Sequence, residues 1–399
     1  MMFKKPNKTD VEKTTETTPK PIETKTSDTF NSLLKDINKR YGGMTIVNAK
    51  TSAVLNRRNR IKTGIFAFDL ALGGGIPTGT ITTIKGEYSS GKSAISHKIA
   101  SAFQRVCRNC GNPLEEWNES KMQAKLIHCC DQPERMRVVW FDAEGSFDNN
   151  WASRLGMHLD STFVIRTEFA EQGIDVADTV LRSGDCDLLV LDSVAQLTPS
   201  TEIENSAEKW QQGLLARLMN KAMRKWVSAQ NAGSLNRAYS PTILLINQVR
   251  LNIGVMYGNP ETSPGGKGIE FASSVILRCK RKGYKMNNVD MPIGHEMEIA
   301  IQKNKTAPPN RSCELTIHIQ NADNYKAGST DEIAQVIAHA EKWGVIERKG
   351  AWYQLSKDHK AQGIEQSSIL LAETPALLQA IKDATWQAEM KYLGNIDDE

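Results

Sequence analysis

The chain has 399 residues, 40% of them hydrophobic, and its 50 Lys and Arg exceed its 46 Asp and Glu by a formal charge of +4. This length indicates two or three structural units, and the apolar fraction excludes a wholly disordered chain. The near-neutral charge does not by itself indicate a nucleic-acid-binding protein, so any basic surface must be local. No stretch approaches the roughly 18 apolar residues of a membrane-spanning helix, and the N-terminus opens with polar residues; we expect a cytoplasmic protein that binds no membrane.

The first 60 residues divide into two segments. Residues 1–27 are rich in Lys, Thr, Glu and Pro, a composition that predicts a flexible tail. Residues 28–60 are predicted to form an amphipathic helix and a linker. The helix carries an apolar face and ends at Gly42 and Gly43; its face consists of Phe30, Leu33, Leu34, Ile37 and Tyr41. This helix either packs on its own domain or docks a neighbouring subunit.

Short apolar runs that alternate with helical stretches predict an α/β core over residues 61–322. The runs are Thr80–Lys85, Met136–Asp142, Asp187–Asp192 and Thr242–Asn247. Near-continuous apolar strands of this kind are buried on both faces, as in a mostly parallel central sheet whose ligand lies beyond the carboxyl ends of the strands. Residues 323–399 carry helical periodicity and a turn at Lys349–Tyr353, and are predicted to form a small α+β C-terminal lobe.

A phosphate-binding motif follows the first of these runs. Residues 86–93 match G-x-x-x-x-G-K-[ST] and open the helical stretch Ser93–Arg105. In such a loop the backbone N–H groups surround the phosphates of a nucleotide, Lys92 reaches the β and γ phosphates, and Ser93 ligates Mg²⁺. The candidate nucleotide-binding residues are Gly86, Glu87, Tyr88, Ser89, Ser90, Gly91, Lys92, Ser93 and Ala94.

Polar residues end the other apolar runs. Asp192 is the expected second partner of Mg²⁺, or else it caps the following turn. Asp142 and Glu144 are both candidates for the carboxylate that orients and deprotonates an attacking water. Gln248 can sense a γ-phosphate without adding charge. By chemistry alone these residues indicate a Mg²⁺-dependent NTPase.

Two segments resemble the RecA family of DNA strand-exchange recombinases. They are Leu188–Thr198, which resembles the second acidic motif, and Ile246–Gly266, which resembles the second DNA-binding loop with its γ-phosphate sensor. The resemblance runs from about residue 28 to about residue 387 and is interrupted near residues 106–136. It implies a P-loop ATPase that forms filaments on single-stranded DNA and catalyses pairing and strand exchange with homologous duplex DNA in DNA repair.

The resemblance also implies roles for single residues. Glu144 is similar to the family's water-activating residue, and Gln248 to the switch that couples the γ-phosphate to the DNA loop. Asp148 and Trp151 stand where the family contacts and stacks on adenine, with Trp in place of a usual Tyr.

Further matches concern contacts between subunits. Lys303 and Lys305 match a pair that reaches ATP from the adjacent subunit, as an arginine finger does. The helix at residues 28–41 resembles the inter-subunit helix of the family, and Phe271 matches an interface residue. Glu270 stands where the family often has a basic residue.

DNA contacts are implied for two loops and one helix. Glu202–Trp210 corresponds to the first DNA loop, and Arg217 and Arg224 follow at a spacing that places them on nearly one helical face. The second loop contributes Arg250, Asn252, Met256 and Tyr257, although Met256 and Tyr257 are alternatively core residues. The basic run Arg278–Lys285 is either part of a second DNA site or a solvated strand end.

Residues 106–136, here called the cysteine insertion, contain a candidate zinc site. Cys107-x-x-Cys110 is followed after 17 residues by His128, Cys129 and Cys130, which is a spacing typical of structural Zn²⁺. Because adjacent side chains of an extended chain point in different directions, we expect the ligands to be Cys107, Cys110, His128 and Cys130, with Cys129 as a substitute for one of them. The alternative is a surface loop with free thiols.

A second functional class stays open at this point. A RecA-fold ATPase that is not a recombinase would act as a mediator or regulatory switch through a protein partner that binds the cysteine insertion. A recombinase would have single-stranded DNA, homologous duplex DNA and its own filament neighbours as partners, together with a single-strand-binding or loader protein. Stimulation of ATPase activity by single-stranded DNA distinguishes the two classes.

Overall fold

The computed structural model describes residues 28–41, 46, 59–119, 121–204, 213–233, 240–251, 261–321 and 325–394. The tail predicted for residues 1–27 lies outside them. The chain divides into two units, Met1–Ser52 and Ala53–Glu399. In the first unit, helix α1 (Asp28–Tyr41) has the bounds that the sequence predicts, and its apolar side chains Phe30 and Leu33 are about half exposed.

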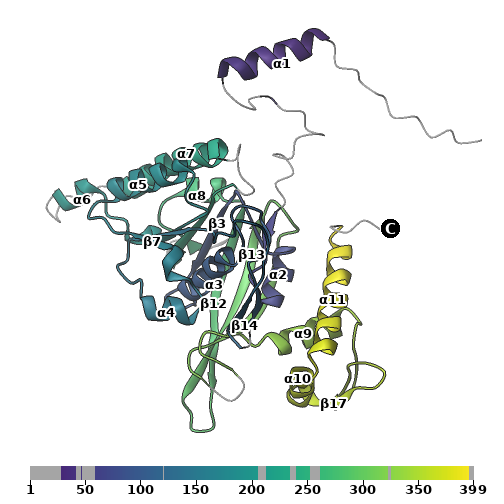
Figure 1. Ribbon diagram of the computed structural model, residues 1–399. Helices are drawn as coiled ribbons and strands as arrows, with labels where there is room; N and C mark the ends of the chain where they lie inside the picture. Colours follow the sequence, from purple (N-terminus) through teal and green to yellow (C-terminus); the bar gives the residue numbers. More distant parts are fainter. Residues whose placement is uncertain are drawn as a thin grey trace, which may run out of the picture. The chain divides into compact units, whose positions relative to one another are not determined.

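The second unit is built on an eight-stranded sheet in the order β14–β13–β12–β3–β9–β8–β6–β7 (Figure 1). Only β13 opposes the common strand direction in this sheet, because it pairs antiparallel with both of its neighbours and the other pairs are parallel. The strands are β3 (Ile81–Gly86), β6 (Val138–Asp142), β7 (Thr162–Ile165), β8 (Leu188–Asp192), β9 (Thr242–Gln248), β12 (Val275–Met286), β13 (Pro292–Asn304) and β14 (Arg311–His318). The predicted mostly parallel α/β core is confirmed.

Helices cover both faces of this sheet. One face carries α2 (Phe66–Leu72), α3 (Lys92–Gln104) and α4 (Asn149–Arg154), and the other carries α5 (Ala170–Ser183), α7 (Leu214–Gly233) and α8 (Lys267–Ala272) (Figure 1). Alternate residues of a strand enter opposite layers: Val190 joins the α3 layer, whereas Leu189 and Leu191 join the α5 and α7 layer. Two buried faces explain why β8 is apolar at four successive positions, Leu188–Leu191.

Shorter elements connect the core. They are β1 (Arg60–Ile61), β2 (Ile76–Pro77), β4 (Glu115–Asn118), β5 (Gln123–Leu126), β10 (Arg250–Leu251), β11 (Glu261–Thr262), α6 (Ser200–Glu204) and the 3₁₀ turns η1 (Leu159–Ser161) and η2 (Val194–Gln196). The strands β4 and β5 pair as a hairpin within the cysteine insertion. None of the helices described is both long and apolar enough to cross a membrane.

The C-terminal lobe has a core of its own. It consists of α9 (Glu332–Lys342), β15 (Glu347–Lys349), β16 (Trp352–Gln354), β17 (Lys360–Gln362), α10 (Gly363–Glu373) and α11 (Pro375–Tyr392). The strands β15 and β16 form a hairpin at the predicted turn. Phe66 and Leu70 of α2 belong to the same buried cluster as Val336 and Leu371 of the lobe, so α2 contributes to the cores on both of its sides.

Candidate nucleotide and DNA site

Four parallel strands end at one edge of the sheet, and each of them ends in a candidate residue. Gly86 of β3 lies opposite Gln248 of β9, and Asp142 of β6 lies opposite Asp192 of β8. The strand order β3–β9–β8–β6 therefore brings these four residues to one edge of the sheet. Ligands of open α/β sheets bind beyond such an edge.

The phosphate loop joins β3 to α3. Gly91 has a φ of 85° directly before the first residue of α3, a conformation that favours glycine. At Gly86 a Cβ atom would lie 2.6 Å from the carbonyl oxygen of Cys279, so the close strand packing also requires glycine. The Lys92 amine donates a hydrogen bond of 2.6 Å to the Glu87 carbonyl across the loop. This interaction holds the amine at the position where phosphate oxygens are expected.

Ser93 and Asp192 lie against each other. The Ser93 hydroxyl lies close enough to the Asp192 carboxylate to lower its pKa, against the effect of burial. Asp192 is only 3% exposed, and its Oδ1 has no hydrogen-bond partner among the residues that the structure describes. A hydroxyl next to a buried carboxylate oxygen is a donor set that suits Mg²⁺. The two residues therefore fit the predicted magnesium site.

Charged groups near Asp192 shift its pKa in opposite directions. Burial and, to a lesser extent, the neighbouring carboxylates of Glu144 and Asp142 raise the pKa of Asp192 to about 7, against the effects of Ser93 and Lys92. Burial likewise lowers the pKa of Lys92, while the charges of Asp192 and Glu144 act in the opposite direction. A divalent cation and a polyphosphate would compensate both groups.

The structure distinguishes the two candidate water-activating carboxylates. Asp142 is buried, and its oxygens accept hydrogen bonds from Arg166 at 2.7 and 3.0 Å and from the backbone N–H groups of Ser146 and Phe147. Glu144 is exposed at the same edge, and its backbone N–H donates to the Asp192 carbonyl at 3.1 Å. Asp142 thus shapes the loop, and this arrangement favours Glu144 for contact with a substrate.

Asp148 and Trp151 begin α4. The Asp148 carboxylate accepts a hydrogen bond of 2.6 Å from the Trp151 backbone N–H and caps the helix, so it has a structural use beside the predicted contact with adenine. Trp151 is partly buried against the core. His97, which sequence reasoning missed, stacks on Phe147 and packs at a tilt against Trp140, and burial lowers its pKa to about 4. It donates from Nδ1 to the Ser93 carbonyl.

Gln248 lies where the phosphate loop meets the strand that leads to the second DNA loop. The residue after it, Val249, donates its N–H to the Gly86 carbonyl at 3.1 Å. The next residues form β10, which pairs with β11, the strand that follows residues 252–260 in the sequence. Arg250 is an exposed residue of β10. The other residues predicted for this loop, Asn252, Met256 and Tyr257, lie outside the described residues.

Arg278 connects the same two loops through its side chain. It is 2% exposed, and its guanidinium contacts Glu261 of β11 at 2.7 Å and Glu87 of the phosphate loop at 3.0 Å. The prediction that Arg278 belongs to a solvated or DNA-facing basic run is wrong, because the strand β12 is buried up to Cys279 and becomes exposed only from Lys280 onward. Arg278 lies opposite Lys85 near the end of β3. No local sequence pattern indicates this position, because it depends on the pairing of two distant strands.

The basic residues predicted to follow the first DNA loop lie on α7. Arg217 and Arg224 are both exposed, whereas Met219, Met223 and Trp226 of the same helix are buried. The two arginines therefore share the solvent face of α7, as their spacing predicts. Of the first DNA loop itself, residues 202–204 belong to α6 and residues 205–210 lie outside the described part of the chain.

Lys303 and Lys305 lie at the end of β13. The Lys303 amine donates to the Glu270 carbonyl at 2.5 Å, and the Lys305 amine donates to the Phe271 carbonyl at 3.4 Å. Both amines are thus directed to the C-terminal end of α8 in their own chain. Phe271 is 73% exposed beside them. The two lysines and Phe271 form one accessible surface.

The four cysteines of the insertion converge. The sulfur atoms of Cys107, Cys110, Cys129 and Cys130 all lie within 4.8 Å of one another, and His128 is not part of this group. The predicted grouping, with His128 and only one of the two adjacent cysteines, is therefore wrong. The chain bends at Cys130 instead of continuing β5 as an extended strand, so adjacent side chains can turn to the same side.

Comparisons with known proteins agree with this geometry. A family model described as the RecA N-terminal domain matches residues 28–112 and 119–322, and one described as the RecA C-terminal domain matches residues 334–388. The chain is 32% identical to Protein RecA of Methylobacterium radiotolerans over 371 residues, which are 92% of this chain and 90% of the relative. It is 33% identical to Protein RecA of Teredinibacter turnerae over 372 residues, which are 93% and 95% of the two chains. The chain therefore belongs to the RecA family and is a recombination protein of DNA repair with the DNA-dependent ATPase activity of that family.

Proposed function

We propose that this protein polymerises on single-stranded DNA and uses ATP to pair that strand with homologous duplex DNA. The observation that supports this most directly is the junction between the phosphate loop and the second DNA loop. Gly86 and Gln248 are paired in the sheet, and Arg278 contacts both Glu87 and Glu261. A change at the γ-phosphate would reach the base of the DNA loop through two short connections.

ATP is proposed to bind along the row of strand ends. Lys92 would contact the phosphates, and Ser93 and Asp192 would hold Mg²⁺, which neutralises developing charge on the transferred phosphoryl group when it is bound. Glu144 would orient the attacking water, and Gln248 would sense the γ-phosphate. Asp148 and Trp151 would contact adenine from the first turn of α4. The loop residues 86–94 would supply backbone N–H groups.

Hydrolysis is proposed to depend on a neighbouring subunit. Lys303 and Lys305 donate to α8 in their own chain and lie beside the exposed Phe271. In a filament this surface would meet the nucleotide of the next subunit, where the two amines would stabilise transition-state charge. The helix α1 would serve as the second contact between subunits.

DNA is proposed to lie along α7 and the two loops. The exposed Arg217, Arg224 and Arg250 would contact backbone phosphates, and Asn252, Met256 and Tyr257 would contact or separate bases. A single-strand-binding or loader protein is the expected further partner, and the cytoplasm is the expected location. The cysteine insertion is proposed to hold a structural Zn²⁺.

Strand exchange between circular single-stranded DNA and linear homologous duplex tests the proposal. We expect joint molecules with ATP and Mg²⁺, filaments in electron micrographs and an ATPase rate that rises with single-stranded DNA. Absence of joint molecules, together with an ATPase rate that DNA does not change, would favour the mediator or switch instead. The double variant Lys303→Gln, Lys305→Gln tests the dependence on a neighbouring subunit. It should bind DNA and ATP but hydrolyse ATP poorly in the filament.

A further inference from the structure

The sulfur atoms of the four cysteines in the insertion all lie within 4.8 Å of one another, and two pairs of them have the spacing of thiolates around one metal ion. The sulfur atoms of Cys107 and Cys130 are 3.7 Å apart, and those of Cys129 and Cys130 are 3.8 Å apart. Four sulfurs placed about 2.3 Å from a tetrahedral Zn²⁺ are about 3.8 Å from one another. A disulfide would need a distance of about 2.05 Å. The observed spacing therefore matches thiolates around one cation and not cysteines in covalent pairs.

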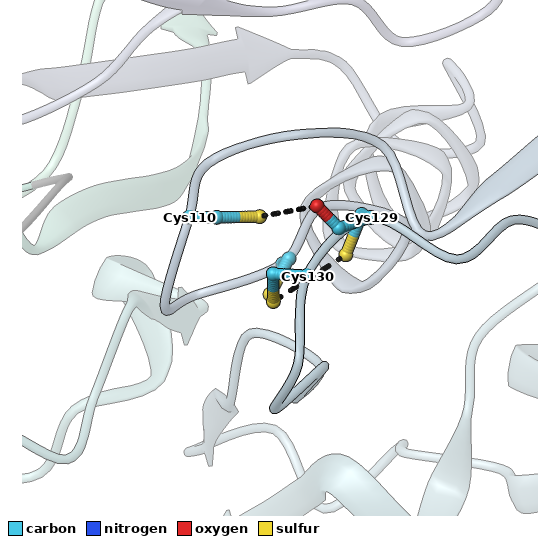
Figure 2. A group of neighbouring side chains, drawn as sticks. Cys110, Cys129 and Cys130 are labelled. Carbon is cyan, nitrogen blue, oxygen red and sulfur yellow. Dashed lines mark hydrogen bonds between the residues drawn. The ribbon is translucent and has the colours of Figure 1, made fainter.

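The backbone holds the two arms of this site together independently of the sulfurs. In the first arm, the Cys107 N–H donates to Asn112 and the Gly111 N–H donates to Cys107, both at 2.8 Å, which closes a tight turn around Cys110. The second arm is joined to the first where Arg108 N–H donates to Glu134 at 2.9 Å. Figure 2 shows Cys110 pointing across the gap toward Cys129. The site is thus arranged by local backbone contacts.

The insertion is attached to α3 at a second place. Lys98 of α3 is fully buried and forms an ion pair of 2.5 Å with Glu119, which follows β4 and is 1% exposed. Trp117 donates to the other oxygen of Glu119 at 2.7 Å and lies under the guanidinium of Arg105. The thiols follow the C-terminal end of α3 and the ion pair lies along its side, so the insertion contacts the helix at two separate points.

We propose that Cys107, Cys110, Cys129 and Cys130 bind one Zn²⁺ as a closed, all-thiolate structural site that fastens the cysteine insertion to the C-terminal end of the phosphate-loop helix. Four protein ligands leave no open position, which excludes a catalytic role for the ion. The proposal deepens the structural-zinc part of the proposed function and specifies the ligands. It does not depend on strand exchange.

Metal analysis of the full-length protein as purified tests the assignment. We expect one zinc per chain, and a cobalt-substituted protein whose absorption spectrum is that of four thiolates. Cys129→Ser and Cys130→Ser should each lower zinc retention against a chelator by at least about tenfold. The matched controls are His128→Asn, beside the site, and Cys186→Ser, a buried cysteine outside it; both should retain zinc. Iron in place of zinc, or zinc loss in His128→Asn with retention in Cys129→Ser, would overturn the proposal.

A measurement on the unmodified chain covers the case in which the serine variants do not fold. Titration with a mercurial should release one zinc as four thiols react, and fewer thiols per zinc would contradict the ligand set. Hydrogen exchange after chelation should speed up in residues 107–130 and in the last turn of α3; unchanged exchange there would overturn the fastening role. Strand exchange is scored separately, so a zinc-free but active recombinase would refute this proposal alone.

Discussion

Two lysines of α3 show that the same type of side chain can be available to a ligand or can stabilise the fold. Lys92, in the first turn of α3, is half-buried beside Asp192 and Glu144, and its amine donates to the Glu87 backbone carbonyl. Lys98, six residues later, is fully buried and paired with Glu119. Burial lowers the pKa of both lysines. The difference lies in the partner: the insertion supplies a permanent anion to Lys98, whereas Lys92 contacts the Glu87 carbonyl and is proposed to bind the phosphates of a substrate.

The same contrast holds for the carboxylates that face these lysines. Burial, together with the charges of Glu144 and Asp142, raises the pKa of Asp192 to about 7. Glu119, in contrast, accepts hydrogen bonds from both Lys98 and Trp117. The carboxylate at the candidate ligand site is therefore buried next to other negative charges, whereas the carboxylate that stabilises the fold has a cation and a hydrogen-bond donor beside it. This distinction leads to tests of the candidate nucleotide site and of the buried ion pair.

Lys92→Ala should give the largest effect. Loss of the amine removes the proposed contact with the β and γ phosphates, so ATP hydrolysis should fall by at least about a thousandfold while the fold is retained. ATP turnover and circular dichroism measure the two properties. Lys125→Ala, an exposed lysine of the insertion, is the control and should behave as wild type. Retained turnover in Lys92→Ala would remove the lysine from the nucleotide site.

Glu119→Gln should mainly lower stability. A buried Lys98 without its anion should cost about 3–5 kcal/mol in the free energy of unfolding, which urea denaturation measures. The double variant Lys98→Met, Glu119→Leu should recover most of the loss, because no charge then stays buried. Glu116→Gln in the exposed pair with Lys125 on the same hairpin should cost less than about 1 kcal/mol. Equal losses at the two pairs would contradict the structural role of Lys98.

Asp192→Asn should change how stability depends on pH. The folded pKa of about 7 lies above the ordinary value of 3.8, so the folded state retains a proton that the unfolded state releases, and the wild type loses stability as pH rises from about 4 to about 7. The variant should lack this loss and be more stable than the nucleotide-free wild type by about 2–4 kcal/mol at pH 8. Thermal unfolding at several pH values measures this. A constant difference at all pH values would contradict the raised pKa.

Arg278→Gln should give the smallest effect and a selective one. Without the bridge between Glu87 and Glu261, DNA-stimulated ATP hydrolysis should fall by about fivefold or more, and the rate without DNA should fall less. Steady-state ATPase assays with and without single-stranded DNA measure both rates. Lys280→Gln, exposed on the same strand, controls for loss of positive charge. An equal loss in both rates would show that Arg278 supports the nucleotide site and not its connection to the DNA loop.

Local patterns in the sequence were sufficient to predict which residues lie at the carboxyl ends of the parallel strands. Glycines, a lysine and a hydroxyl at set spacing define the phosphate loop, and apolar runs that end in Asp192 or Gln248 define strands whose ends meet, because parallel strands end at the same side of a sheet. Alternate residues of each strand point to opposite faces of the sheet, so a short apolar run is enough to predict that both faces are buried. The fold class and the gathering of the candidate residues at one edge of the sheet were therefore predictable.

Contacts between distant segments were decided only by the tertiary structure. The bend at Cys130 brings two adjacent cysteines into one group, although an extended chain would separate them. The position of Arg166 engages Asp142 and leaves Glu144 exposed. Arg278 is buried within a run of basic residues because β12 passes from the interior to the surface one residue after Cys279. The sequence by itself determined which chemical groups the protein has and on which elements they lie; their partners depend on how those elements pack, since a charge or thiol contacts whatever the fold places beside it.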